Sequence, residues 1–356
     1  MANEIQAVFC TAVGKVEIKA APKPTLHPGY LLVKTKAVAL NPTDWKSIYD
    51  PSGLAVGTRV GVDFSGIVEE VGADVKQPWT KGDRICGFVF GGKHAESGAF
   101  GDYLVATPHN QLKIPDNLSF EEAATLGVAV TTCGQALYQL LSLPLPPAPA
   151  SDPPRWILIG GGSTATAVVG IQYAKLSGLK VAATASPYNF EYLQSLGVDL
   201  LLDYHEDTDA LVKKIRAVTG DDLLLAWDCS PNDKFPKVAG LSLSQTKKSI
   251  YATVSPLTPP DFLKKTNPLV ESKFQLGYTA FGETFTRMGV EFPASKEDAD
   301  FAEAFWAHSE PLLADGTIKP TRFTLNRGGE SWAGVVHGLE ELRNGRVSGT
   351  KLVYTV

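Results

Sequence analysis

Hydrophobic and polar positions alternate in short segments along the first 110 residues, and Gly, Pro and Asp separate these segments. We expect strands at 31–40, 61–71, 83–90 and 100–106. The stretch VKTKAVA in the first of them alternates residue by residue, as a strand with one solvated face does. Many short strands joined by glycine-rich turns predict a compact, barrel-like β domain.

The pattern becomes helical after Pro115. Ser119 followed by Glu122 is a capping box that opens a helix, and a second helix is expected at 130–141. The proline-rich stretch 143–154 excludes both helix and central strand, because proline lacks an amide donor and has a fixed φ. We interpret it as a stiff surface loop rather than a domain boundary.

Beyond residue 156, apolar strands alternate with helices. The expected strands lie at 156–162, 181–185, 200–203, 223–229, 249–254 and 274–281, with helices at 163–177, 189–196 and 210–218. Continuous apolar strands separated by helices predict a parallel sheet covered on both faces. Six such strands indicate a doubly wound dinucleotide-binding fold.

The last 60 residues return to mixed elements. We expect a helix at 297–314, a strand at 321–325, a helix at 331–344 and a strand at 351–355. The chain is therefore predicted to be an α/β protein of two domains. A discontinuous β-rich domain would comprise 1–127 and 286–356, and a Rossmann domain with a six-stranded parallel sheet would comprise 128–285.

Composition narrows the function classes. The 356 residues include 33 Lys+Arg and 38 Asp+Glu, a net charge of 33 − 38 = −5, which argues against a nucleic-acid partner. No apolar run is long enough to span a membrane, and the first ten residues lack a secretory pattern, so we expect a cytoplasmic protein. The four cysteines are at least 47 positions apart and the six histidines are not closely paired, so we expect neither disulfides nor a metal site.

The strongest chemical signal is the glycine-rich turn that follows the first strand of the predicted Rossmann domain. Gly160, Gly162 and Ala165 fit the dinucleotide fingerprint, and a second frame, Gly161, Thr164 and Ala167, fits nearly as well. Glycines let the backbone approach a pyrophosphate, and the helix that follows supplies amide donors. The turn predicts a nicotinamide dinucleotide site.

The second strand of this domain bears on the choice between NADH and NADPH. An NAD-preferring fold places a carboxylate at its end, whereas this strand is followed by Ser186, Tyr188 and Asn189. These side chains can donate hydrogen bonds to a 2′-phosphate, so NADPH is favoured. This loop contains neither Lys nor Arg. Lys175 or Tyr204 could contribute to 2′-phosphate binding from adjacent elements.

Two segments of the first domain resemble the medium-chain dehydrogenase/reductase superfamily. They are Gly61–Gly72 and Lys81–Ile85. In its zinc alcohol dehydrogenases the first segment begins Gly-His-Glu and supplies a metal ligand, whereas Val62 and Asp63 stand there in this chain. The four-cysteine lobe of those enzymes is also missing. The chain therefore resembles the zinc-free branch, which includes quinone reductases and enoyl reductases.

Narrower motifs resemble the trans-acting enoyl reductases of fungal polyketide pathways, of the lovastatin type. The matching segments are Asn41–Lys46, Gly161–Ala167, Ser186–Asn189 and Val347–Gly349. The resemblance covers nearly the whole chain and implies a GroES-like first domain. It also implies NADPH-dependent reduction of an α,β-unsaturated thioester that a separate polyketide synthase carries on its acyl carrier domain.

The resemblance also implies site residues. Those implied for NADPH are Thr43, Asp44, Trp45, Lys46, Gly161, Gly162, Ser163, Thr164, Ala165, Thr166, Ala167, Ser186, Pro187, Tyr188, Asn189, Phe190, Tyr204, Val347 and Ser348. Those implied for the acyl chain are Cys133, Gly134, Leu137, Leu140, Leu276, Gly277, Tyr278, Thr279 and Ala280.

Hydride addition to the β-carbon moves negative charge onto the thioester oxygen, which needs a donor, and the α-carbon then needs a proton. Lys46 is the first candidate for contact with the cofactor or the enolate, and Thr43 is the alternative hydroxyl. The competing interpretation is that both are surface residues of a loop after Pro42. Tyr278 and Tyr138 are further candidates for substrate contact. No residue stands out as a dedicated acid, so water is an equal candidate for the proton source.

Two other functions stay open at this point. The chain also fits a stand-alone zinc-free NADPH quinone or enone reductase, and a non-catalytic NADPH-binding protein. The favoured partner is a polyketide synthase, alone or in a hybrid with a peptide synthetase, and the chain itself is expected to be a monomer. An acidic carrier domain would dock on basic residues, and the chain gathers several late in the sequence: Lys319, Arg322, Arg327, Arg343 and Arg346.

Overall fold

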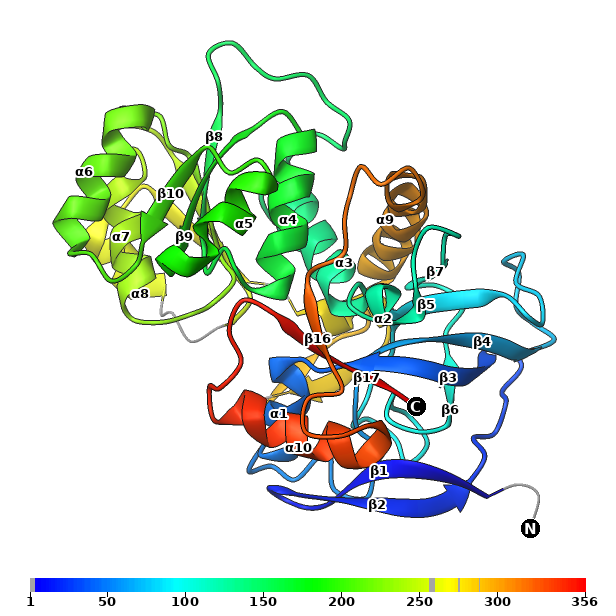
Figure 1. Ribbon diagram of the computed structural model, residues 1–356. Coiled ribbons are helices and arrows are strands. Elements are labelled where there is room, and N and C mark those ends of the chain that lie inside the picture. Colours follow the sequence, from blue (N-terminus) through cyan, green and yellow to red (C-terminus); the bar gives the residue numbers. More distant parts are fainter. Residues whose placement is uncertain (1–3, 256–259, 275, 288) are drawn as a thin grey trace. The chain divides into compact units, whose positions relative to one another are not determined.

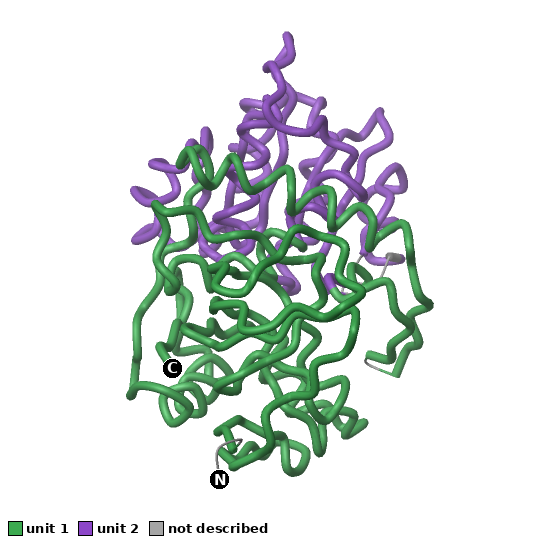
Figure 2. The backbone as a smooth tube through the Cα atoms, turned by 90° about the vertical axis from the view of Figure 1, so that its right-hand side faces the viewer, with its two compact units in different colours: residues 1–131, 278–356 green, residues 132–277 purple. Residues whose placement is uncertain are grey.

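The computed structural model describes residues 4–255, 260–274, 276–287 and 289–356. The chain forms two compact units (Figure 2): unit 1 comprises Met1–Thr131 and Tyr278–Val356, and unit 2 comprises Thr132–Gly277. The predicted domain limits, after residues 127 and 285, lie within eight residues of these boundaries, since 131 − 127 = 4 and 285 − 277 = 8.

Unit 1 is built on strands that pair antiparallel, except for the parallel pair β16–β17. They are β1 (Glu4–Ala12), β2 (Lys15–Pro22), β3 (Leu31–Ala39), β4 (Asp63–Val71), β5 (Arg84–Phe88), β6 (Tyr103–Ala106), β7 (Gln111–Lys113), β14 (Phe285–Arg287), β15 (Val290–Phe292), β16 (Phe323–Leu325) and β17 (Lys351–Thr355). The main sheet has the order β16-β17-β3-β4-β5-β7, and β6 also pairs with β3. Its core contains Phe64, Ile85, Phe100 and Tyr354.

The helices of unit 1 are α1 (Pro42–Ile48), α2 (Phe120–Ala123), α9 (Lys296–Ala314) and α10 (Ser331–Arg343). Ser119 caps α2 by accepting a hydrogen bond from the amide of Glu122, as the capping box predicted. Two helical segments cross the unit boundaries, α3 (Gly127–Cys133) and the 3-10 helix η3 (Gly277–Phe281).

Unit 2 contains a parallel sheet (Figure 1). Its strands are β8 (Trp156–Gly160), β9 (Lys180–Ala185), β10 (Leu200–Asp203), β11 (Leu225–Asp228), β12 (Ser249–Thr253) and β13 (Val270–Phe274). Their order is β10-β9-β8-β11-β12-β13, so the chain order reads 3-2-1-4-5-6, the arrangement of dinucleotide-binding folds. The predicted fold class, a β-rich unit joined to a doubly wound sheet, is confirmed.

The helical segments of unit 2 are the π-helix η1 (Gly134–Leu140), α4 (Ala165–Leu176), the 3-10 helix η2 (Pro187–Asn189), α5 (Phe190–Ser195), α6 (Thr208–Thr219), α7 (Lys234–Ser242) and α8 (Pro260–Thr266). The proline-rich stretch 143–154 has neither helix nor strand and lies within unit 2. Within the described ranges, no helix is both long and apolar enough to cross a bilayer.

The predicted sixth strand, 274–281, is wrong. The strand is β13, which ends at Phe274, and residues 277–281 form the helix η3. Gln275 lies outside the described residues. The polar residues Glu271 and Lys273 concealed the true strand, because it is an edge strand with one solvated side. The apolar run at 277–281 instead leaves the sheet, and its residues from Tyr278 onward belong to unit 1.

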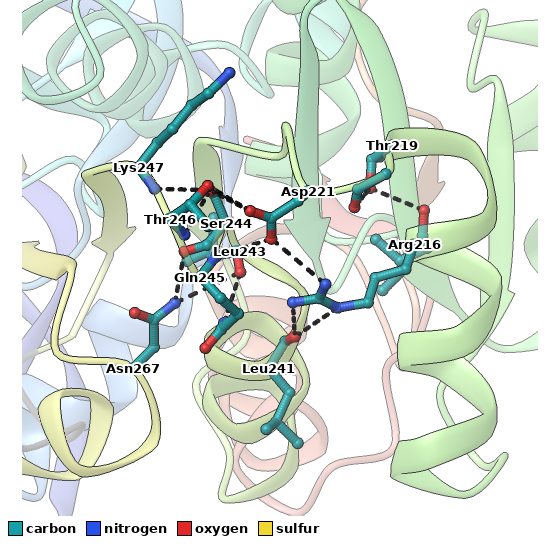
Figure 3. Close-up of polar contacts among 12 residues, drawn as sticks. Arg216, Thr219, Asp221, Leu241, Leu243, Ser244, Gln245, Thr246, Lys247 and Asn267 are labelled. Carbon is teal, nitrogen blue, oxygen red and sulfur yellow. Dashed lines mark hydrogen bonds and ion pairs between the residues drawn. The ribbon is translucent and has the colours of Figure 1, made fainter.

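A polar network holds together the amino-terminal ends of β11, β12 and β13 (Figure 3). The carboxylate of Asp221 accepts hydrogen bonds from the amide of Gln245 at 2.9 Å and the hydroxyl of Thr246 at 2.7 Å. Asn267 donates to the carbonyl of Ser244 at 2.9 Å. Parallel sheets bind ligands at the opposite edge, where strands end. This network is therefore a structural element, and the ligand edge is the one at Gly160.

Candidate functional site

The turn after β8 requires glycine. Gly161 has a φ of +66°, and a Cβ there would lie 2.4 Å from the Cβ of Ser230. The amide of Gly161 donates to the hydroxyl of Thr184 at 3.2 Å, and that of Gly162 donates to the Thr184 carbonyl at 2.8 Å. The turn is thus bound to the end of β9, and its shape is fixed before any ligand binds.

The amides beyond this turn face no protein acceptor. Thr164 caps α4, and its hydroxyl accepts from the amide of Ala167 at 3.2 Å. The amides of Ser163, Ala165 and Thr166 have no acceptor in the described part of the chain. Free amides at the positive end of a twelve-residue helix suit a phosphate group. The turn therefore fits the pyrophosphate of a dinucleotide.

The ends of β9 and β10 bring two predicted residues together. The hydroxyl of Ser186 donates to that of Tyr204 at 3.1 Å, and the Tyr204 ring lies 4.1 Å from that of His205. Pro187 and Tyr188 are exposed, whereas Asn189 is buried and Phe190 half-buried. The loop after β9 thus presents hydroxyl groups beside an exposed aromatic pair.

Lys234, at the start of α7, is a cation that sequence reasoning missed. Its Nζ donates to the carbonyl of Tyr204 at 2.8 Å and to that of Glu206. Lys175 does not contribute there. It lies near the far end of α4, about 15 Å along the helix from the turn, and pairs with Asp199 at 2.6 Å. The only signal for Lys234 in the sequence is its position shortly after a parallel strand ends.

A buried ion pair anchors the start of α1 in unit 1. Lys351 and Asp63 pair at 2.7 Å with side chains 3% and 0% exposed, and Asn41 contacts both. The register explains the meeting, since Ala39 of β3 lies opposite both Asp63 of β4 and Val353 of β17. Asp63 also accepts from the amide of Val128. Asp63 therefore has Lys351, Asn41 and a backbone amide as partners.

Asp44 is buried beside this pair with fewer partners. Its Oδ2 accepts from the amide of Asn41 at 2.7 Å, and its Oδ1 has no hydrogen-bond partner within the described ranges. Burial raises the pKa of Asp44 to about 8, and the nearby carboxylate of Asp63 adds to this effect. The carboxyl group is therefore protonated at neutral pH.

The predicted donors lie on α1 rather than in a loop, because Asn41 and Asp44 form the first hydrogen bonds of a helix there. The hydroxyl of Thr43 lies 2.8 Å from that of Tyr278. Lys46 is exposed, and its Nζ lies 5.8 Å from the centre of the Trp45 ring. Partial desolvation lowers the pKa of Lys46. Both donors thus stand on a rigid element.

The other predicted residues are placed as follows. Val347 and Trp45 pack against the same core of unit 1, while Ser348 is exposed. Of the residues predicted for the acyl chain, Cys133, Gly134, Leu137, Tyr278 and Ala280 are buried and Leu140, Leu276, Gly277 and Thr279 are half-buried. The thiol of Cys133 donates to the carbonyl of Thr166 at 3.4 Å, and burial raises its pKa well above the usual value. These acyl-chain assignments stay predictions.

Comparisons with known proteins are consistent with this arrangement. Residues 27–116 match the alcohol dehydrogenase GroES-like domain. The chain is 41% identical to a trans-enoyl reductase of Alternaria alternata, over 99% of this chain and 98% of that protein. It is 42% identical to one of Aspergillus sclerotiorum, over 99% of this chain and all of the relative. This chain belongs to the trans-enoyl reductase family.

Solved structures with the same fold are more distant in sequence. The enoyl reductase CurK matches with a TM-score of 0.76 and 16% identity, over 99% of each chain. A quinone oxidoreductase from Coxiella burnetii matches with a TM-score of 0.73 and 22% identity, again over 99% of each chain. The trans-enoyl reductase fold is thus shared with enzymes of both kinds.

Three of the five late basic residues of this trans-enoyl reductase form ion pairs with two glutamates. Arg327 and Arg346 both pair with Glu341, at 2.7 and 2.9 Å, and Arg343 lies 3.5 Å from Glu340. The guanidinium of Arg322 donates to the carbonyl of Gly349. The described residues also contain no group of three metal-ligating side chains. The docking of an acidic carrier on the late basic residues stays a prediction.

Proposed function

We propose that this trans-enoyl reductase uses NADPH to reduce the α,β-double bond of a carrier-bound polyketide thioester, acting in trans on a polyketide synthase. The observation that carries the proposal is end-to-end similarity, above 40% identity, to proteins named trans-enoyl reductases. The glycine turn between β8 and α4 in unit 2 can bind the cofactor, and Thr43 and Lys46 on α1 in unit 1 can donate to the substrate.

NADPH, when bound, supplies the hydride that adds to the β-carbon of the substrate. The protein then has to accommodate the negative charge that reaches the thioester oxygen. In unit 1, Lys46 and Thr43 are the proposed donors to that oxygen, each held by α1. A proton from water completes the reduction at the α-carbon, so one hydride and one proton are added across the double bond.

The preference for NADPH over NADH is proposed on the loop after β9. The paired hydroxyls of Ser186 and Tyr204 can donate to a 2′-phosphate, and Lys234 adds a positive charge beside Tyr204. A carboxylate that would bind the 2′-hydroxyl of NADH is not found at the end of β9, where the chain continues as Ser186 and Pro187.

The remaining proposals concern assembly. We propose a β-rich catalytic domain and a Rossmann cofactor domain that correspond to units 1 and 2. The partner is proposed to be the acyl carrier domain of a polyketide synthase, alone or in a hybrid with a peptide synthetase, with this chain as a monomer. The cytoplasmic location stays a prediction.

The decisive experiment measures NADPH oxidation by the purified chain with three acceptors. These are an enoyl chain on a carrier domain, the same chain on pantetheine, and a free quinone. We expect turnover of the thioesters, faster on the carrier, and little with the quinone. Quinone turnover without thioester turnover would identify a stand-alone reductase instead.

Two companion measurements test the named residues. Lys46→Ala should lower kcat with the carrier-linked substrate, and an undiminished kcat and cofactor affinity would remove Lys46 from the mechanism.

Replacing NADPH with NADH should lower kcat/KM. The Lys234→Met variant should show a smaller difference in kcat/KM between the two coenzymes. Equal use of both coenzymes by the unaltered chain would contradict the NADPH preference.

A further inference from the structure

The hydroxyl of Tyr278 connects two side chains that lie far apart in the sequence. It is 2.8 Å from the Thr43 hydroxyl on α1 and accepts a hydrogen bond of 2.8 Å from Nη2 of Arg287 on β14. Tyr278 is 4% exposed and Arg287 8%. Thr43, at the end of this chain of hydrogen bonds, is half-buried. The three groups thus lead from a buried cation to the hydroxyl of a half-buried residue.

The direction of these hydrogen bonds follows from the chemistry of the donors. A guanidinium can only donate, so Tyr278 accepts from Arg287. If Thr43 also donated to Tyr278, the buried phenolic hydrogen would have no acceptor in the described part of the chain. A buried unsatisfied hydroxyl is costly, whereas a half-buried one can bond to water or ligand. The Tyr278 hydroxyl therefore donates to Thr43, and the hydrogen of Thr43 is left to donate outward.

The aromatic surroundings hold Tyr278 in this orientation. Its ring lies 4.4 Å from that of Phe90, 5.5 Å from Phe88 and 5.9 Å from Phe285. The guanidinium of Arg287 also lies 4.6 Å from the centre of the Tyr278 ring. Packing on several sides restricts rotation of the tyrosine, so the phenolic oxygen stays in place between its two partners.

Arg287 carries a charge that no acidic side chain neutralises. It forms no ion pair with any residue that the structure describes, although it is more than nine-tenths buried. Burying a cation without a counter-ion is unfavourable and calls for a compensating role. Its charge lowers the pKa of the Asp44 carboxyl group, but burial raises that pKa to about 8 and so favours the neutral form of Asp44. The positive charge is therefore available to polarise Tyr278.

We propose that Arg287 and Tyr278 are positioning residues that orient the Thr43 hydroxyl as a donor to the substrate oxygen on which negative charge develops. This inference rests on the proposed function and adds two residues to it. A preorganised donor costs no reorientation when the charge forms, so it stabilises the transition state more than the bound substrate. The positive end of the hydrogen-bond chain at Arg287 strengthens the same donor.

The test compares five variants with the carrier-linked enoyl substrate: Thr43→Val, Thr43→Ser, Tyr278→Phe, Arg287→Met and Arg287→Lys. Loss of an oxyanion donor lowers kcat by about 10²–10³-fold, so we expect this of Thr43→Val. Tyr278→Phe and Arg287→Met should lower kcat about tenfold or more with little change in KM. Thr43→Ser and Arg287→Lys, which keep the donors, should recover most of the activity.

Tyr354→Phe is the matched control. Tyr354 is also a buried tyrosine of unit 1, and its hydroxyl donates to the carbonyl of Arg327 at 2.9 Å, away from Thr43. The Tyr354→Phe variant should leave kcat unchanged, which separates the positioning role of Tyr278 from a general effect of losing a buried hydroxyl. A wild-type kcat in Tyr278→Phe, or equal losses in Arg287→Lys and Arg287→Met, would overturn the proposal.

Failure of the proposed function would be recognised separately. If the unaltered chain does not reduce the thioester but reduces a small enone, the proposed function is wrong, and the same variants are measured on the enone. The carbonyl oxygen of the enone also receives negative charge during the reaction. The same ranking of the variants by kcat would therefore still support the positioning role. Absence of turnover with every acceptor would reject both.

Discussion

Two aspartates, one in each unit, respond to their surroundings in opposite ways. Asp221 in unit 2 accepts hydrogen bonds from four residues, one of them Arg216 at 3.4 Å (Figure 3), and its pKa falls to about 2. Asp44 in unit 1 accepts one hydrogen bond from the amide of Asn41, and burial raises its pKa to about 8. Hydrogen bonds to the charged form dominate at Asp221, and desolvation dominates at Asp44.

The difference separates a structural aspartate from one at a candidate site. The network of Asp221 satisfies both carboxylate oxygens and joins the amino-terminal ends of strands, away from the ligand edge. Asp44 keeps one oxygen without a partner in the described ranges and directly follows the proposed donor Thr43. Carboxyl groups with raised pKa values are more frequent at functional sites, whereas satisfied networks mainly contribute stability.

The largest expected effect comes from breaking the buried pair beside Asp44. Lys351→Met leaves the carboxylate of Asp63 buried without its cation, so we expect a loss of about 3–5 kcal/mol in the free energy of unfolding. Urea denaturation measures it. Lys247→Met is the control, because it breaks an ion pair with Asp222 that is more than half exposed. Similar urea midpoints for the two variants would contradict the assigned importance of burial.

An intermediate effect is expected from Asp44→Asn. The raised pKa means that folding disfavours ionisation, so the wild-type chain loses stability as the pH rises from about 4 to about 8. Asparagine resembles the protonated carboxyl and does not ionise. We therefore expect the variant to be more stable than the wild type at pH 8 and equally stable near pH 4.

Urea midpoints of the Asp44→Asn variant and the wild type across this range provide the measurement. Parallel curves, with no change in their separation between pH 4 and pH 8, would show that Asp44 ionises in the folded protein as readily as in the unfolded chain. The contrast with Asp221 would then disappear.

The smallest effect is expected from Asp221→Asn, with the opposite pH dependence. Its lowered pKa contributes stability that is present above about pH 4 and is lost as the pH falls toward about 2. The variant should therefore have a slightly lower urea midpoint than the wild type at pH 7 and the same midpoint near pH 2. A larger deficit at pH 2 than at pH 7 would refute the assigned direction.

Local pattern predicted unit 2 better than unit 1. The strands β8 to β12 lie within the predicted ranges or differ from them by one residue, because strands buried on both faces are continuous apolar runs. The edge strand β13 was misplaced for the converse reason, since its exposed side carries Glu271 and Lys273. In unit 1, the mostly exposed strand β2 has too little apolar alternation to be recognised.

The candidate site was predicted in part. Glycines at the turn and hydroxyls after β9 follow from local requirements, and the structure shows a tight glycine turn after β8 and a hydrogen bond between Ser186 and Tyr204. Lys234 was missed because it reaches Tyr204 from an element 30 positions away. The pairing of Arg327 and Arg346 with Glu341 was also not predicted, because composition does not show which charges meet.

The sequence by itself determined the fold class and the glycine turn after β8, together with the family motifs in which Thr43 and Lys46 lie. These depend on periodicity, glycine conformations and neighbours within a few positions. Only the tertiary structure decided that Tyr278 stands between Arg287 and Thr43, 235 positions from the latter, and that Lys351 neutralises Asp63. Hydrogen-bond direction and burial depend on contacts between residues that are far apart in the sequence, so they are set only when the chain folds.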